Sequence, residues 1–317
     1  MKKLLIASTA LVATAGVAAA DVTLSGTARF GLKYDDSSPV RGGSDVELEK
    51  RMTLNIDAAT QTDAGVEFGA RVRLRSDEVA GTGVNGAYVY ASANGFTVRA
   101  GNIVGAIEAM PNLYSASVGL TGLQWTGLAT NVAGTGTSGA FAWDAYDSPG
   151  NGAEGLEVIY SMDAFTFHIS ASPDRTMQMT GGRGSAAATA GSPRRVAAYG
   201  AYSFDGWTVA LAAQDSSAAG DDIIGITVDG NLGDFGVGAQ LFDNDNTTKG
   251  SVYGSATFDQ ITAKAFVARQ DAAPGIATRT TWGIGADYDL GGATLRGGIA
   301  RNTAKDTLAD FGVTFSF

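Results

Sequence analysis

Cysteine is absent from this chain of 317 residues, and histidine occurs only once, at His168. Without thiols there can be no disulfide, no thiolate metal site and no cysteine nucleophile. A single histidine, set in an alternating segment between Phe167 and Ile169, cannot form a zinc cluster, and no histidine-based triad can be assembled around it. The composition therefore argues against an enzyme and predicts no metal site and no cofactor.

Hydrophobic runs long enough for a membrane-spanning helix are also missing. The longest apolar run, residues 4–17, follows two lysines and precedes three alanines that end at Ala20. It falls short of the roughly 20 residues that a helical span needs. The basic start, the short apolar run and the A-x-A ending are typical of a secretory signal peptide. We expect residues 1–20 to be removed and residues 21–317 to form a single domain.

Basic side chains are scarce relative to acidic ones. The chain has 22 Lys and Arg against 32 Asp and Glu, so the loss of Lys2 and Lys3 with the signal peptide leaves a formal charge of −12. A chain with this excess of negative charge is poorly suited to the phosphate backbone of nucleic acids. Nucleic acid is therefore not an expected partner.

Proline occurs only six times, and the segments after Asp21 alternate between apolar and polar residues. Between Val22 and Tyr34, for example, every second residue is apolar or small and the residues between are mostly polar, which is the period of a β-strand. Sixteen strands are predicted in this way, at residues 22–34, 45–58, 66–75, 86–93, 95–103, 154–162, 165–172, 194–204, 207–214, 221–231, 234–243, 249–259, 261–270, 279–289, 293–302 and 308–317.

The predicted connections alternate between tight turns and longer polar loops. The tight turns carry Asn, Asp or Gly, as hairpin turns do. They are expected at 63–65, 94–95, 162–164, 205–206, 231–233, 259–260 and 291–292. An even number of strands with short turns on one rim and long loops on the other is the layout of an outer-membrane barrel.

Closure of the sheet is expected because an open sheet of this width would leave unpaired edges, which lipid does not tolerate. A secreted β-sandwich or propeller is the alternative, but it would need covered faces or repeats that the sequence does not show. The fold class predicted is all-β: a 16-stranded antiparallel transmembrane β-barrel with short periplasmic turns, long external loops and an aqueous lumen. Aromatic residues near the predicted strand ends, among them Tyr88, Trp207 and Tyr288, are interpreted as interfacial girdles.

Four segments carry a family resemblance. They are DVTLSGTARFGLKYDD, TQTDAGVEFGARVRL, GFTVRAGN followed by IVGAIEAMPNLYSAS, and YDLGGATLRGGIARN with the ending ADFGVTFSF. Together they resemble the Rhodobacter-type porins of alphaproteobacteria. The resemblance implies a homotrimer of 16-stranded barrels among the lipids of the outer membrane of a Gram-negative cell. It also implies that Phe317 belongs to an ending recognised by the barrel-assembly machinery.

One connection, at about 104–153, is far longer than an ordinary loop, which indicates either a function or disorder. It contains many apolar residues, including Met110, Leu113, Leu123, Trp125 and Leu128, and these are enough to pack against something. The resemblance implies that this third loop folds into the barrel and narrows it as a constriction loop.

Six arginines share the polar phase of the first, second, third and fifth predicted strands and are expected to point into the lumen. They are Arg29, Arg51, Arg71, Arg73, Arg75 and Arg99. Porins of the family set such a basic wall against acids of the inward loop, which here number only three: Glu108, Asp144 and Asp147. This departure predicts a constriction that prefers cations less than is usual in the family. The alternative is a solvated polar face in which the arginines pair with Asp57, Glu49 and Glu67.

The expected function is that of an outer-membrane porin through which small hydrophilic solutes and ions diffuse passively. Two alternatives stay open at this point. One is a solute-specific channel of the same fold, in which aromatic side chains of the long loop bind a sugar or an aromatic solute. The other is a structural or adhesive barrel whose lumen is plugged by that loop.

Overall fold

The computed structural model describes residues 21–36, 45–77, 83–84, 86–129, 141–146, 154–173, 193–244, 246–271 and 277–317. The strands are β1 Asp21–Asp35, β2 Val46–Gln61, β3 Glu67–Asp77, β4 Gly83–Val84, β5 Tyr88–Ala93, β6 Phe96–Asn102, β7 Glu154–Met162, β8 Phe165–Ser172, β9 Arg195–Phe204, β10 Trp207–Ser216, β11 Ile223–Leu232, β12 Phe235–Asn244, β13 Thr247–Phe258, β14 Ile261–Gln270, β15 Arg279–Asp289, β16 Ala293–Arg301 and β17 Thr307–Ser316. In these residues no helix is long and apolar enough to cross a bilayer.

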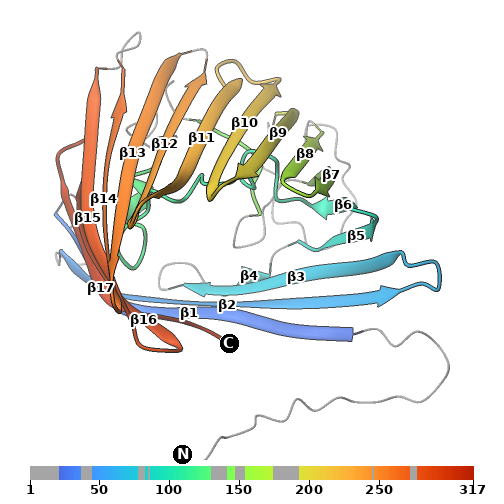
Figure 1. Cartoon of the computed structure of the whole chain (residues 1–317), viewed down its shortest axis with the longest axis horizontal. Coiled ribbons are helices and arrows are strands. Elements are labelled where there is room, and N and C mark those ends of the chain that lie inside the picture. Colours follow the sequence, from blue (N-terminus) through green and yellow to red (C-terminus); the bar gives the residue numbers. More distant parts are fainter. Residues whose placement is uncertain are drawn as a thin grey trace, which may run out of the picture.

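The strands form one closed antiparallel sheet (Figure 1). Neighbours in the chain are neighbours in the sheet, and β17 pairs with β1 to complete the ring. The two-residue β4 and the longer β5 both pair with β3, so they are two parts of one interrupted barrel strand. The predicted 16-stranded barrel is confirmed, and four strands, β7, β8, β14 and β15, have the predicted bounds.

Tight turns join the strands at one rim, where the sequence predicts them. In the β5–β6 turn, Asn94 and Gly95 have φ angles of 51° and 83°. In the β9–β10 turn, Asp205 and Gly206 have φ angles of 46° and 79°. Two successive left-handed residues make the type I′ turn, whose twist matches that of the flanking strands. The Asn-Gly and Asp-Gly pairs therefore fix the register of these hairpins.

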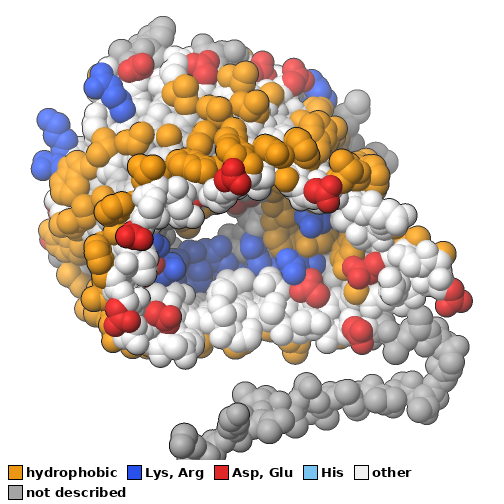
Figure 2. All heavy atoms as spheres, in the orientation of Figure 1, with side chains coloured by type: hydrophobic (Ala, Val, Ile, Leu, Met, Phe, Trp, Pro, Cys, Tyr) orange, Lys and Arg blue, Asp and Glu red, His pale blue; other side chains and the backbone are white. Residues whose placement is uncertain are grey.

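The outer surface of the barrel is apolar (Figure 2). Large hydrophobic side chains are exposed on strands all around the ring, for example Leu24 at 62%, Leu48 at 66%, Ile224 at 64% and Phe258 at 65%. Such a surface would be costly in water, whereas it matches the hydrocarbon core of a membrane. Lys and Arg side chains are visible inside the opening instead.

Barrel closure involves the last residue of the chain. The backbone N–H of Gly26 donates to the carbonyl of Phe317 at 2.7 Å, and the N–H of Phe317 donates to the carbonyl of Gly26 at 3.0 Å. A Cβ on Gly26 would lie 2.6 Å from the Phe317 ring, so glycine at this position lets the terminal ring approach β1 closely.

One predicted interfacial aromatic lies elsewhere. Tyr88 is only 5% exposed, and its ring meets Tyr146 edge-on with the centroids 5.6 Å apart. Its register partner on β3 is Arg71, so it shares the phase of the predicted inward arginines. The interpretation of Tyr88 as a girdle residue is therefore wrong: proximity to a strand end does not say which face of the strand a side chain occupies.

Candidate pore constriction

The chain after β6 turns into the barrel and packs against the inner face of β9 to β17. We call residues 103–129 and 141–146, the described part of this connection, the inner loop. Its apolar residues form one cluster with small and aromatic side chains of β9 to β12 and a second cluster with β14, β16 and β17. Met110, Leu113 and Leu128 are at most 3% exposed in the first cluster, and Leu123 is 2% exposed in the second.

This packing explains why the inner face of β9 and β10 carries small apolar side chains. On β9 and β10 the inward side chains include Ala197, Tyr199, Ala210 and Ala212, all of which the inner loop covers. Small alanines leave room for the loop, and their burial offsets the cost of removing the loop from water. The lumen therefore has one wall that the inner loop covers and, facing it, the uncovered wall of β1 to β3.

Polar side chains of the covered wall bind the backbone of the inner loop. Gln240 on β12 donates to the carbonyls of Asn112 and Leu113 at 2.7 and 2.8 Å and accepts from the N–H of Ala129 at 3.1 Å. Hydroxyl groups on three other strands also donate to loop carbonyls. Thr227 on β11 donates to Pro111 at 2.7 Å, Ser251 on β13 to Gly127 at 2.6 Å, and Thr281 on β15 to Thr126 at 2.7 Å. Buried backbone groups need such partners, so the contacts hold the irregular loop in place.

The tip of the inner loop is held by one carboxylate, Asp310 on β17. It accepts the N–H of Leu120 at 2.8 Å, the N–H of Thr121 at 2.7 Å and the hydroxyl of Thr121 at 2.7 Å. Asp310 is 6% exposed, and a Cβ on Gly119, whose φ is +76°, would lie 2.2 Å from its Oδ1. The glycine thus allows the carboxylate to approach the loop backbone closely.

The next turn of the loop has an uncommon backbone. Gly122, Leu123, Gln124 and Trp125 have φ angles of 81°, 46°, 59° and 56°, so a short left-handed 3-10 turn, η1 (Leu123–Trp125), forms. A left-handed conformation costs a residue other than glycine roughly 1–2 kcal/mol. The burial of Leu123 and the packing of the Trp125 ring on Gly122 offset this cost. Strain of this kind is retained where surrounding contacts over-determine it.

The uncovered wall and the inner loop enclose a cavity of about 490 Å³. Five of the six predicted arginines line it, together with two cations that the sequence analysis did not single out. We call these seven side chains the cationic lining; they are Arg29, Arg51, Arg71, Arg73, Arg75, Lys264 and Arg296. On the loop side the lining includes Ser117, Thr121, Trp125 and Tyr146, and among the described residues it includes no Asp or Glu.

Among the described residues, the carboxylates behind the cationic lining are fewer than the cations. Asp77 is shared by Arg51 at 2.8 Å and Arg75 at 3.1 Å, and Asp287 is shared by Lys264 at 2.7 Å and Arg296 at 3.5 Å.

Two further pairs use one carboxylate each: Arg29 bonds Glu49 at 2.6 Å and Arg71 bonds Asp57 at 2.6 Å. These cations therefore form salt bridges and line the lumen at the same time. Each shared acid, Asp77 or Asp287, neutralises only one of its two cations. Glu67, the third acid that the sequence analysis considered as a partner, instead accepts from the Tyr90 hydroxyl at 2.9 Å.

Arg73 contacts the inner loop itself. Its guanidinium donates to the carbonyl of Tyr146 and lies over the Tyr146 ring, 4.6 Å from the centroid. Burial raises the pKa of Tyr146, so this loop phenol stays neutral at physiological pH. An arginine of the wall is thus already stacked on an aromatic ring of the loop.

Arg99 lies apart from the cavity, at the root of the inner loop. It is 3.4 Å from Glu157 on β7, which also accepts the backbone N–H of Gly105. His168 is fully buried, with Nε2 3.7 Å from the same carboxylate. This group fixes the point where the chain leaves β6. No group of three potential metal ligands occurs among the described residues.

The predicted loop acids do not line the cavity where they are described. Glu108 accepts hydrogen bonds from the Tyr114 hydroxyl at 2.7 Å and from Trp143 Nε1 at 2.8 Å, within the loop. Asp144 is 7% exposed and lies 3.5 Å from Arg195 on β9. Asp147 lies outside the described residues.

The barrel and its inner loop match known proteins over nearly the whole chain. A family model described as Gram-negative porin matches residues 7–307. This chain belongs to the Gram-negative porin family. The porin of Fuscovulum blasticum is 31% identical over 314 residues, which cover 94% of this chain and 100% of that protein. The porin of Rhodobacter capsulatus is 29% identical over 331 residues with the same coverage.

The solved structures agree. A triple mutant of the porin of Rhodopseudomonas blastica has a TM-score of 0.77 and 28% identity to this chain, covering 94% of it and 100% of the mutant chain. The predicted family and the predicted outer-membrane location are thereby confirmed, and so is channel function.

Two cations of the lining, Lys264 and Arg296, are not among the predicted residues, because the predicted basic wall comprises only strands near the N-terminus. Lys264 shares the inward phase of Phe266 and Ala268 on β14, and Arg296 lies on β16, which β17 separates from β1. Closure of the barrel brings both strands to the side of β1. The alternation of the sequence predicts that these side chains face the lumen. It does not predict that they lie on the side that the inner loop leaves uncovered, because that depends on where the loop packs.

Proposed function

We propose that this porin is an open diffusion channel for small hydrophilic solutes and that its narrowest part lies between the inner loop and the cationic lining. The observation that carries the proposal is the composition of the cavity wall. Among the described residues, seven cations and no acid line it, and two of the carboxylates behind the cations are each shared by two of them. A preference for anions follows, because an anion within about 4 Å of one uncompensated charge gains roughly 1 kcal/mol even in water.

The purified porin in a planar bilayer tests both parts of the proposal. We expect stepwise, ohmic single-channel currents and, under a tenfold KCl gradient at low salt, a reversal potential of the sign that chloride permeation gives. The preference should weaken at 1 M salt, where the screening length falls to about 3 Å. A marked potassium preference would contradict the charge argument. Silence from inserted protein would instead support a plugged barrel.

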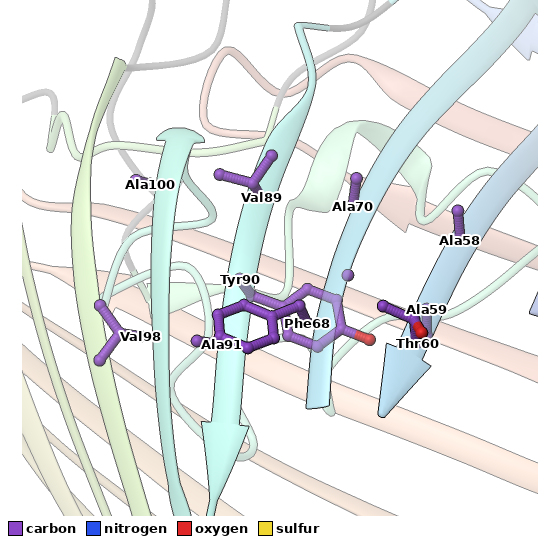
Figure 3. A pocket seen from close by; sticks show the side chains of 11 residues that line it. Ala58, Ala59, Thr60, Phe68, Ala70, Val89, Tyr90, Ala91, Val98 and Ala100 are labelled. Atoms are coloured by element: carbon purple, nitrogen blue, oxygen red, sulfur yellow. The ribbon is translucent and has the colours of Figure 1, made fainter. Parts of the chain in front are cut away.

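We also propose that the porin is a homotrimer, associated through the outer face of β2, β3, β5 and β6. This face carries a shallow apolar hollow with the small side chains of Ala58, Ala70, Ala91 and Ala100 on neighbouring strands (Figure 3). Phe68, Val89 and Val98 border it and are 41% to 56% exposed. Small residues let neighbouring backbones approach closely inside a bilayer.

Tryptophan at the hollow should separate the subunits. We expect Ala70→Trp with Ala91→Trp to convert a detergent-stable trimer into monomers, because the added indoles fill the space that a neighbouring barrel would occupy. Ala239→Trp, an exposed alanine on β12, is the matched control and should remain trimeric. Molar mass from light scattering after size exclusion reads the result. A monomeric parent protein, or equal dissociation of the control, would refute this interface.

A further inference from the structure

The cavity presents an aromatic surface beside its cations. Trp125 of the inner loop lines the same space as Arg29, Arg51 and Arg75. The indole is only half buried, so part of its ring faces the cavity. The ring is therefore available to a solute.

The position of this indole is rigidly fixed. Its six-membered ring packs on Gly122, where a Cβ would lie 2.7 Å from Trp125 Cε3. The ring of Tyr114 meets it edge-on, with the centroids 5.1 Å apart. Trp125 itself has a left-handed backbone with φ of 56°, in the strained turn η1. The neighbouring residues thus hold the indole in one orientation at the edge of the cavity.

Polar groups of the same cavity lack partners. Within the described part of the chain, Ser117 Oγ, Tyr146 Oη and Arg296 Nε are buried without a hydrogen bond, and all three residues line the cavity. Buried polar atoms normally have a hydrogen-bond partner, so a small movement of these side chains toward the cavity would let water or a polar solute supply one.

The contact between Arg73 and Tyr146 shows how a ring can be bound there. A guanidinium of the cationic lining already stacks on an aromatic ring at 4.6 Å. Arginine binds aromatic faces and carboxylates with the same planar group. A solute that has both a ring and a carboxylate could therefore contact Trp125 with the ring and the arginines with the charge.

We propose that the space between Trp125 and the cationic lining is a binding site for aromatic carboxylates. The proposal rests on the diffusion channel proposed above and deepens it: the pore passes small anions generally and retains those that carry a ring. Such retention appears as transient, saturable block of the current, whereas simple diffusion gives none.

The test is block of single-channel chloride current by sodium benzoate, compared with sodium acetate, which lacks the ring, and benzyl alcohol, which lacks the charge. We expect saturable block by benzoate and little block by the other two. Trp125→Ala should weaken benzoate block about tenfold, the scale of a lost aromatic contact. Trp125→Phe should restore most of it. Gln124→Ala, in the same turn but outside the cavity lining, is the matched control.

The outcomes separate this inference from the proposed function. An open, chloride-preferring pore in which benzoate and acetate act alike would overturn the aromatic site and leave the diffusion channel standing. Equal block in the parent and in Trp125→Ala would do the same, even if benzoate blocks both. A pore that carries no current would overturn both proposals.

Discussion

Neutralising Arg51 and Arg75 together should remove most of the anion preference of this porin. Both guanidinium groups line the cavity, and both bond Asp77, at 2.8 and 3.1 Å. In the variant Arg51→Gln with Arg75→Gln the cavity loses two positive charges, and Asp77 keeps its negative charge without these two partners. Glutamine approximates the length of the arginine stem, so the pore width changes little while the local charge changes strongly.

The expected result is a fall of about tenfold in the anion-to-cation permeability ratio at 0.1 M salt, from the combined loss of anion attraction and gain of cation attraction. Reversal potentials in a KCl gradient measure it. Arg269→Gln with Arg301→Gln removes the same formal charge from exposed side chains outside the cavity lining and should keep the parent ratio. An unchanged ratio in the cavity variant would place the ion preference elsewhere in the chain.

The strands could be predicted from the sequence because the two faces of a transmembrane barrel strand meet different solvents. Lipid on one side and water or the loop on the other impose a period of two, which a residue pattern records directly. The turns were equally readable, since Asn94-Gly95 and Asp205-Gly206 can take two successive left-handed conformations where most other pairs cannot. Closure then follows from the cost of unpaired edges in lipid.

The constriction could be predicted only in part, because part of it is an irregular loop without a period. The inward phase of Arg71, Arg73 and Arg75 follows from alternation, so their lining of the cavity could be expected. The places of Asp144 and Glu108 depend on how an irregular loop packs, and no period describes such a loop.

The roles of Asp310 and Trp125 likewise depend on contacts far apart in sequence. Asp310 lies 189 and 190 residues from the loop groups that it binds. The only local indication of this role is that Asp310 is an acid among small and apolar residues of the last strand. A buried acid in such surroundings needs a polar partner.

Removing the Asp310 carboxylate should release the tip of the inner loop while the barrel stays folded. The sheet is held by backbone hydrogen bonds, in which this side chain takes no part. The carboxylate instead accepts three hydrogen bonds from Leu120 and Thr121 of the loop. Hydrogen bonds to a charged group contribute roughly 1.5–3 kcal/mol each, and the buried N–H groups left behind carry a further cost unless water enters. Asp310→Ala therefore favours a loop whose tip moves in the lumen.

Two measurements report this release. Hydrogen exchange of the Leu120 and Thr121 amides should accelerate by roughly a hundredfold, which corresponds to about 3 kcal/mol of lost local stability. Single-channel records should show added open-state noise, because the mobile tip changes the pore width. Gly119→Ala should act alike, since its Cβ would lie 2.2 Å from the Asp310 carboxylate.

Asp205→Asn, at a remote turn where asparagine accepts the same left-handed backbone, should leave both signals as in the parent. Quiet currents and protected amides in Asp310→Ala would mean that the apolar clusters alone hold the loop. The constriction would then depend on apolar packing, without a measurable contribution from the carboxylate.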